Sequence, residues 1–184
     1  MAAKPGPIIG SVIFLGIAPG VVAGWIPYTL SRWHMEPPFL GVQAGRWIGG
    51  ALVMVGFAVL VDSFARFALE GKGTPAPVAP TETLVVSGLY RHVRNPMYLA
   101  VVAAILGQAL LFGSVSLLTY AAVVWGLFHL FVLAYEEPTL RRRFGDSYRV
   151  YQREVGRWRP RLKPWDPGAQ FWPGPTAKEQ GING

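Results

Sequence analysis

The sequence predicts an all-α integral membrane protein with four transmembrane helices. Hydrophobic residues make up 52% of the 184-residue chain and charged residues only 15%, whereas soluble domains average about 25% charged residues. Several long segments contain no charged side chain. Aromatic residues account for 13% of the chain, too many for a disordered polymer. These observations together exclude an ordinary soluble domain and favour a membrane protein.

The first two predicted spans cover residues 8–30 and 45–69. A helix of roughly 20 apolar residues crosses a bilayer core about 30 Å thick. Residues 8–30 contain no charge, and they exceed the apolar region of about 7–15 residues that is typical of a signal peptide. Asp62 and Arg66 lie four residues apart in the last turns of the second span. We expect them to pair where this helix leaves the hydrocarbon.

The third and fourth predicted spans form a helical hairpin. No Lys, Arg, Asp or Glu occurs from Asn95 to Tyr135. A single helix of that length would measure roughly 60 Å, twice the thickness of the bilayer core. The turn residues around Gly113 are the break near the middle of this segment. The pattern therefore predicts two arms, over residues 96–112 and 115–135.

Basic residues predict the orientation in the membrane. More than half of the 17 Lys and Arg residues lie between Arg141 and Lys163, and a second group lies between the second and third spans. The positive-inside rule then places both termini and the 70–95 loop in the cytoplasm. Membrane lipids with anionic headgroups are expected partners of this basic face. Nucleic acid is not, because no recognition motif accompanies the spans.

Residues 138–155 predict a basic amphipathic helix that lies on the membrane. Apolar residues recur there at spacings of three and four, and arginines occupy the other faces. A simple surface anchor would explain this pattern equally well. Residues 1–163 are predicted to form a single domain, and the Pro- and Gly-rich residues 164–184 a disordered tail.

Two polar clusters flank the hairpin. The first lies in residues 89–98, which an interfacial belt of Tyr and Arg would also explain. The second is Glu136-Glu137, two adjacent carboxylates that are costly at the end of a span unless a cation compensates them. Intramembrane-edge polar groups of this kind are candidate functional residues.

Several kinds of chemistry are excluded by composition. The chain has no cysteine, which removes disulfides, thiolate nucleophiles and cysteine metal sites. With three histidines in total, no metal site is expected. No phosphate-binding loop, dinucleotide fingerprint or nucleophile elbow occurs. His129 lies alone in the fourth span, where a hydrogen-bonded packing role is favoured over a ligand.

The two polar clusters carry a family resemblance. The motif RNPMY at residues 94–98, followed by EExxLxxxFGxxYxxYxxxVxRxxP over residues 136–160, resembles the isoprenylcysteine carboxyl methyltransferase family. That family belongs to a wider group of integral membrane methyltransferases that includes phospholipid methyltransferases. The resemblance covers about residues 72–163. The chain departs from the family motif at Asn95, which replaces His, and at Ala100, which replaces Gly.

The resemblance implies S-adenosylmethionine as methyl donor, bound in a pocket at the cytoplasmic mouth of the hairpin that the C-terminal amphipathic helix caps. It also implies a lipophilic acceptor that enters from the bilayer. Arg94 and Glu137 are the implied catalytic residues, in one pocket on opposite sides of the donor's amino-acid moiety. The implied donor-binding residues are His92, Asn95, Tyr98, Glu136, Glu137 and Tyr148.

Two other functions are weighed against methyl transfer. Membrane sterol reductases share a related C-terminal architecture and bind NADPH there. A non-catalytic membrane scaffold is the remaining alternative. Neither the acceptor nor the oligomeric state can be inferred from the sequence.

Overall fold

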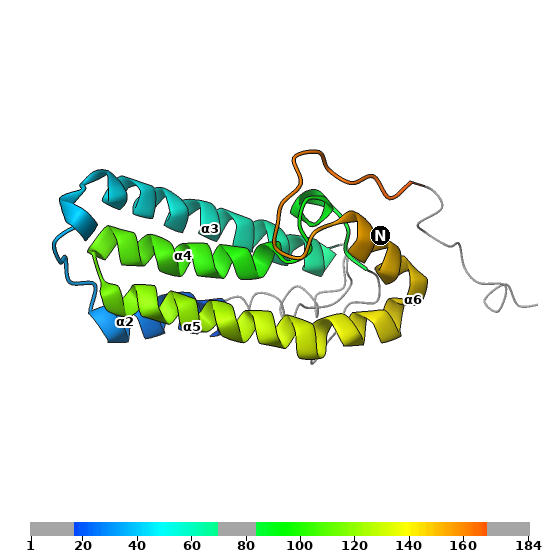
Figure 1. Ribbon diagram of the computed structural model, residues 1–184, viewed down its shortest axis with the longest axis horizontal. Helices are drawn as coiled ribbons and strands as arrows, with labels where there is room; N and C mark the ends of the chain where they lie inside the picture. The colour runs from blue at the N-terminus through cyan, green and yellow to red at the C-terminus, as the bar shows by residue number, and fades with distance from the viewer. Residues whose placement is uncertain (1–16, 70–83, 169–184) are drawn as a thin grey trace, which may run out of the picture.

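The computed structural model describes residues 17–69 and 84–168, and these form helices joined by short connections. The helices over Ala44–Leu69, Pro96–Phe112 and Val115–Phe131 lie side by side, each antiparallel to the next along the chain (Figure 1). The elements are η1 (Val21–Trp25), α2 (Ile26–Ser31), η2 (Phe39–Gly41), α3 (Ala44–Leu69), η3 (Gly88–Arg91), α4 (Pro96–Phe112), α5 (Val115–Phe131), η4 (Val132–Glu136) and α6 (Glu137–Glu154). The described residues contain no strand, which confirms the prediction of an all-helical fold.

The predicted hairpin is confirmed, with α4 as its first arm and α5 continued by η4 as its second. Pro96 occupies the first turn of α4, where its missing N–H costs no helical hydrogen bond. Gly113 ends α4 in the left-handed region, with φ of 73°, and its N–H bonds to the carbonyl of Ala109. The hairpin returns the chain to the end of the bundle at which α4 began (Figure 1).

Helices α3 and α4 pack backbone against backbone through glycines. A methyl group added at Gly49 would lie 2.5 Å from the carbonyl oxygen of Gly107 and 2.6 Å from the nitrogen of Leu111. One at Gly56 would lie 2.8 Å from the carbonyl of Ala100. Small residues permit this close approach in a membrane, where van der Waals packing replaces the hydrophobic effect as the driving force between helices.

The first predicted span is helical from residue 17 to Ser31, and its residues 8–16 lie outside the described part of the chain. The π-helix η1 interrupts it. Two side chains of the hairpin donate hydrogen bonds to backbone carbonyls of η1. Tyr120 donates to Val22 at 2.9 Å, and Gln108 donates to Ala23 at 2.7 Å. Polar side chains inside the bundle thus stabilise an irregular helix away from water.

The apolar surface of the bundle fits a membrane environment. Two described helical segments are long and apolar enough to cross a bilayer, Ala44–Arg66 and Val115–Glu154, and the shorter apolar helix Pro96–Phe112 lies between them. Large side chains such as Trp47, at 82% exposure, and Met54, at 75%, point outward from α3. A patch of this kind on a soluble protein would promote aggregation.

The predicted Asp62–Arg66 pair is confirmed, with two hydrogen bonds of 2.9 and 3.0 Å.

Helix α6 differs from the prediction of a helix lying on the membrane. Its apolar face packs against the protein itself, in a cluster of Leu84, Val86, Tyr148, Tyr151, Val155 and Trp165. Gly145 breaks the helix, with φ of 53° and ψ of −125°, so that the second half folds back over the first. The packed region therefore extends past residue 163 to Trp165, whereas residues 169–184 of the predicted tail lie outside the described chain.

The contact between α3 and α4 leads to a stability prediction. We expect Gly49→Ala to lower the free energy of unfolding by about 1–3 kcal/mol, because the added methyl group meets backbone atoms that cannot move aside. Gly50→Ala is the matched control, since a methyl group there meets nothing within 4 Å. Thermal unfolding in detergent measures both variants. Equal melting temperatures for the two would contradict this account of the packing.

Candidate functional site

Three segments meet at the end of the bundle where α4 begins: residues 91–95, the η4–α6 junction and residues 155–166. Backbone hydrogen bonds of 2.9 Å join the first segment to the third, from Arg94 to Gly156, from Arg161 to His92 and from Trp165 to Arg91. Because these bonds pair consecutive parts of both segments, they hold the C-terminal segment across the mouth of the hairpin.

Glu137 lies at the centre of this junction, with its side chain only 4% exposed. Arg157 binds it with both arms of its guanidinium group, Nε to Oε1 at 2.6 Å and Nη2 to Oε2 at 2.9 Å. Arg94 Nη1 lies 3.0 Å from Oε1, and Gln152 donates to Oε2 at 3.1 Å. Arg141 Nη2 lies 3.7 Å from Oε2. Both oxygens of Glu137 are therefore engaged by the protein.

The prediction that Arg94 and Glu137 come together is confirmed, but their relation differs from the one expected. They were expected on opposite sides of a bound donor, and the structure brings them into a direct ion pair. With both oxygens already bound, Glu137 has little capacity left for a ligand's ammonium group. Its contacts suit a positioning residue that holds Arg94 and Arg157 in place.

The electrostatics of Glu137 follow from these contacts. Roughly 20 helical residues are enough to cross the bilayer core. Counted from Val115, such a span ends near Tyr135, so α6 lies beyond the membrane-spanning part of the hairpin. Burial would raise the pKa of Glu137, but the hydrogen bond from Arg157 and the positive charges of Arg94, Arg157 and Arg141 lower it below the usual range. Burial, with the nearby charge of Glu137, raises the pKa of Tyr148 to about 12.

Glu136 has different partners from its neighbour. Tyr98 donates a hydrogen bond to its Oε2 at 2.7 Å, and its Oε1 has no hydrogen bond or ion pair among the described residues. The two carboxylates diverge because they follow each other at the end of the π-helix η4. The wider turn of a π-helix changes the directions of the side chains that follow it, and such bulges are frequent at functional sites.

Tyr98, which binds Glu136, lies against further aromatic rings. The ring centroids of Tyr98 and Trp158 lie 6.5 Å apart, and those of Trp125 and Trp158 lie 4.6 Å apart. Trp158 Nε1 donates a hydrogen bond to His129 Nδ1 at 3.0 Å. The predicted packing role of His129 is thus confirmed, and Trp158 reaches the site from the C-terminal segment.

The remaining predicted donor-binding residues mainly hold the chain together. His92 Nδ1 lies 2.8 Å from the carbonyl oxygen of Arg161, and Asn95 Nδ2 donates to the carbonyl of Arg157 at 3.2 Å. Tyr148 lies on α6 and is buried in the apolar cluster that this helix forms with Leu84, Val86 and Trp165. Their predicted contacts with a donor stay predictions, whereas their contacts with the C-terminal segment are direct.

The sequence reasoning missed the residues that complete the ion-pair cluster, Arg141, Gln152 and Arg157. Arg157 belongs to the recurring motif over residues 136–160, so its position carried a signal. Gln152 lies on α6 beyond the reversal at Gly145, and nothing in its spacing indicates that it would face Glu137.

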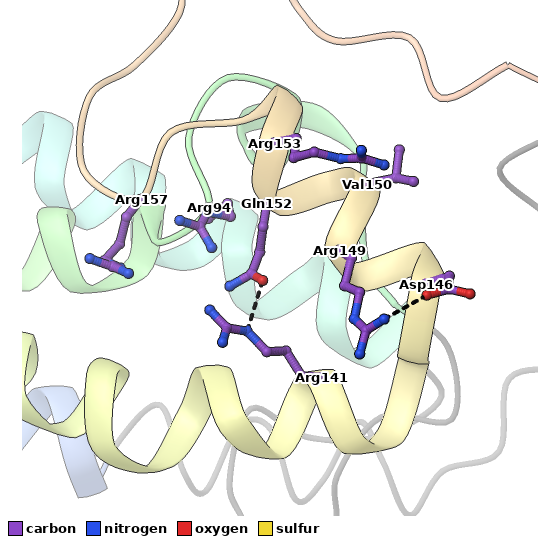
Figure 2. A pocket seen from close by; sticks show the side chains of 8 residues that line it. All are labelled: Arg94, Arg141, Asp146, Arg149, Val150, Gln152, Arg153 and Arg157. Atoms are coloured by element: carbon purple, nitrogen blue, oxygen red, sulfur yellow. Dashed lines mark hydrogen bonds and ion pairs between the residues drawn. The ribbon is translucent and has the colours of Figure 1, made fainter.

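A cavity of about 610 Å³ opens beside this cluster, between the two halves of α6 (Figure 2). Its lining residues are Arg94, Arg141, Asp146, Arg149, Val150, Gln152, Arg153 and Arg157. Among the described residues, no group of three or more His, Asp or Glu side chains is arranged to hold a metal ion.

An apolar helical hairpin with a polar, ion-paired cluster at one end is typical of a helical membrane protein. The comparisons with known proteins identify the family. The model of the phospholipid methyltransferase family matches residues 44–147, more than half of the chain. The chain belongs to this family, and the match includes α3, which lay outside the resemblance described above.

Two curated proteins are similar in sequence. A protein-S-isoprenylcysteine O-methyltransferase of Schizosaccharomyces pombe is 38% identical over 73 residues, which cover 39% of this chain and 30% of the relative. A methanethiol S-methyltransferase of Pseudomonas deceptionensis is 28% identical over 154 residues, 79% of this chain and 55% of the relative. The matched part of the chain thus spans 30% of the first relative's length and 55% of the second's. No solved structure matches it significantly.

The ion-pair cluster predicts a large effect of neutralising Glu137. We expect Glu137→Gln to destabilise the protein by about 3–5 kcal/mol, because two largely buried guanidinium groups lose their carboxylate. Asp146→Asn is the control. Its side chain is 91% exposed and pairs only with an exposed arginine, so a change below about 0.5 kcal/mol is expected. Thermal unfolding in detergent measures both.

The pH dependence checks the same assignment. The lowered pKa of Glu137 means that its contribution to stability is present above the unfolded-state pKa of about 4.3 and is lost as the pH falls through the folded-state value. The difference in melting temperature between the wild type and Glu137→Gln should therefore be constant near neutrality and shrink below about pH 4. A difference that shrinks between pH 8 and pH 6 would contradict the assignment.

Proposed function

We propose that this chain transfers a methyl group from S-adenosylmethionine to a lipophilic acceptor at the membrane face that carries α6. The observation that carries the proposal is the division of roles between two adjacent carboxylates. Both oxygens of Glu137 are bound by the protein, whereas Glu136 Oε1 has no partner within the described residues and Oε2 accepts from Tyr98. Family membership supports the reaction class, and the named activities of the two relatives are both methyl transfers.

The residues around Glu136 fit the methyl donor. S-adenosylmethionine carries an ammonium and a sulfonium, and it supplies an electrophilic methyl group when bound. A carboxylate oxygen without a partner suits the ammonium. The faces of Tyr98 and Trp158 suit a cation, because aromatic rings attract positive charge. The hydrogen bond from Tyr98 orients the Glu136 carboxylate.

The other residues of the site position these groups and limit the access of water. The bonds from residues 91–95 hold the C-terminal segment, and with it Trp158, across the mouth of the hairpin. Glu137 fixes the guanidinium groups of Arg94 and Arg157. By the family resemblance, Arg94 contacts the acceptor. Methyl transfer depends on in-line geometry more than on acid–base chemistry, so positioning and exclusion of water supply most of the rate.

Donor binding provides the direct test. Calorimetry of the full chain in detergent should show S-adenosylhomocysteine binding at roughly 5–8 kcal/mol. Glu136→Gln should weaken this by about 1.5–3 kcal/mol, the value of a charge-assisted hydrogen bond. Glu154→Gln, an exposed carboxylate on α6, should leave the affinity unchanged. Binding of NADPH in place of either S-adenosyl ligand would overturn the proposal, and equal affinities for the two variants would end the assignment of Glu136.

The membrane arrangement proposed with this function has four spans and both termini in the cytoplasm, where the donor is available. The native chain has no cysteine, so single engineered cysteines report sidedness cleanly. Lys163→Cys should react with an impermeant maleimide only from the cytoplasmic side. Leu40→Cys, in the connection between α2 and α3 and 99% exposed, should react only from the other side. The reverse pattern would place the site on the side that lacks the donor.

A further inference from the structure

The cavity between the two halves of α6 has a marked excess of positive charge. Five arginines line it, and they come from the 91–95 segment, both halves of α6 and the C-terminal segment (Figure 2). Their ion pairs reach only two carboxylates, Glu137 and Asp146. Arg153 has no ion pair or hydrogen bond within the part of the chain that the structure describes. Three positive charges of the lining are thus left unmatched.

Arg94 provides a second, independent observation. Its side chain is 9% exposed and borders the cavity. Nη1 forms the ion pair with Glu137 at 3.0 Å, whereas Nε makes no hydrogen bond among the described residues. Buried donors normally find acceptors, because an unmade hydrogen bond costs free energy. A buried guanidinium whose Nε has no acceptor, beside an arginine-lined cavity, favours an anionic ligand.

The charge and shape of the lining discriminate among ligands. S-adenosylmethionine carries one net positive charge, which the unmatched arginines would repel. A carboxylate is planar and carries one negative charge, so it would engage one or two of the five arginines. A phosphate group carries up to two charges and accepts hydrogen bonds in tetrahedral directions, and guanidinium groups bind it through paired donors. Arginines placed around a cavity therefore fit phosphate best.

We propose that this cavity is a phosphate-binding site, separate from the methyl-donor contacts around Glu136. The phosphate belongs either to a lipid headgroup or to a soluble phosphate compound, because the cavity adjoins the end of the spanning hairpin and is also reached by exposed side chains such as Arg149. Its volume of about 610 Å³ admits a group larger than phosphate alone. The proposal does not depend on the methyl acceptor.

The test compares two double variants of the full chain. Arg149→Gln with Arg153→Gln removes two lining arginines that lie outside the Glu137 cluster. Arg142→Gln with Arg143→Gln is the control, because it removes the same charge from exposed positions of α6 that do not line the cavity. Exposed substitutions such as these usually change stability only slightly, so both variants are expected to fold.

The first arm uses inorganic phosphate in detergent, against chloride at the same ionic strength. If the affinity is about 1 mM, 10 mM phosphate should raise the melting temperature by about 3–5 °C in the wild type and in the control. The shift should be lost in the lining variant. The second arm uses nanodiscs of phosphatidylcholine with phosphatidic acid, against discs in which oleate supplies the same surface charge without a phosphate group.

A shift in the first arm that depends on the lining arginines supports a site for soluble phosphate. The same dependence in the second arm alone assigns the phosphate to a lipid headgroup. Equal shifts in the two double variants, or no shift in either arm, would overturn the proposal. Affinity for S-adenosylhomocysteine should be the same in both double variants, so failure of this site and failure of the proposed donor site give different results.

Discussion

The buried carboxylate of Glu137 is the constraint on which this end of the molecule depends. A lone carboxylate removed from water is costly, and it persists only with paired charges and hydrogen bonds around it. Its partners come from residues 91–95, from both halves of α6 and from the C-terminal segment. The charge of Glu137 is compensated only when those segments come together. The same ion pairs and hydrogen bonds in turn hold the segments in place.

The π-helix η4 explains how two neighbouring glutamates come to differ. Along a regular α-helix, consecutive side chains point about 100° apart, and both here would still lie near the lipid boundary. With the added residue of a π-turn, Glu136 reaches Tyr98 on α4 while Glu137 reaches the arginines. One carboxylate compensates buried arginines, and the other keeps one oxygen without a partner among the described residues. The irregular turn thus gives two neighbouring carboxylates different surroundings.

Much of the fold followed from the sequence, because the bilayer imposes a length on each apolar segment. The hairpin limits of 96–112 and 115–135 and the meeting of Arg94 with Glu137 both derive from that constraint. The sequence does not predict which residues pack against α6, because an apolar stripe indicates that a helix face is buried but not what buries it. Leu84, Val86 and Trp165 cover it instead of lipid. The reversal at Gly145 was equally hidden, because glycine permits a positive φ without requiring it.

The two proposed sites have opposite electrostatic preferences, and Glu137 lies between the residues that define them. Around Glu136, a free carboxylate oxygen and aromatic faces suit a cation. Between the halves of α6, unmatched arginines suit an anion. The excess positive charge of an unfilled cavity would oppose a cationic donor nearby, and a bound phosphate would reduce that opposition. Any such coupling must be reciprocal, so the donor would favour phosphate binding to the same extent. Glu137 already compensates part of this charge. The ion pairs that stabilise the cluster therefore also determine the electrostatic potential at both proposed sites.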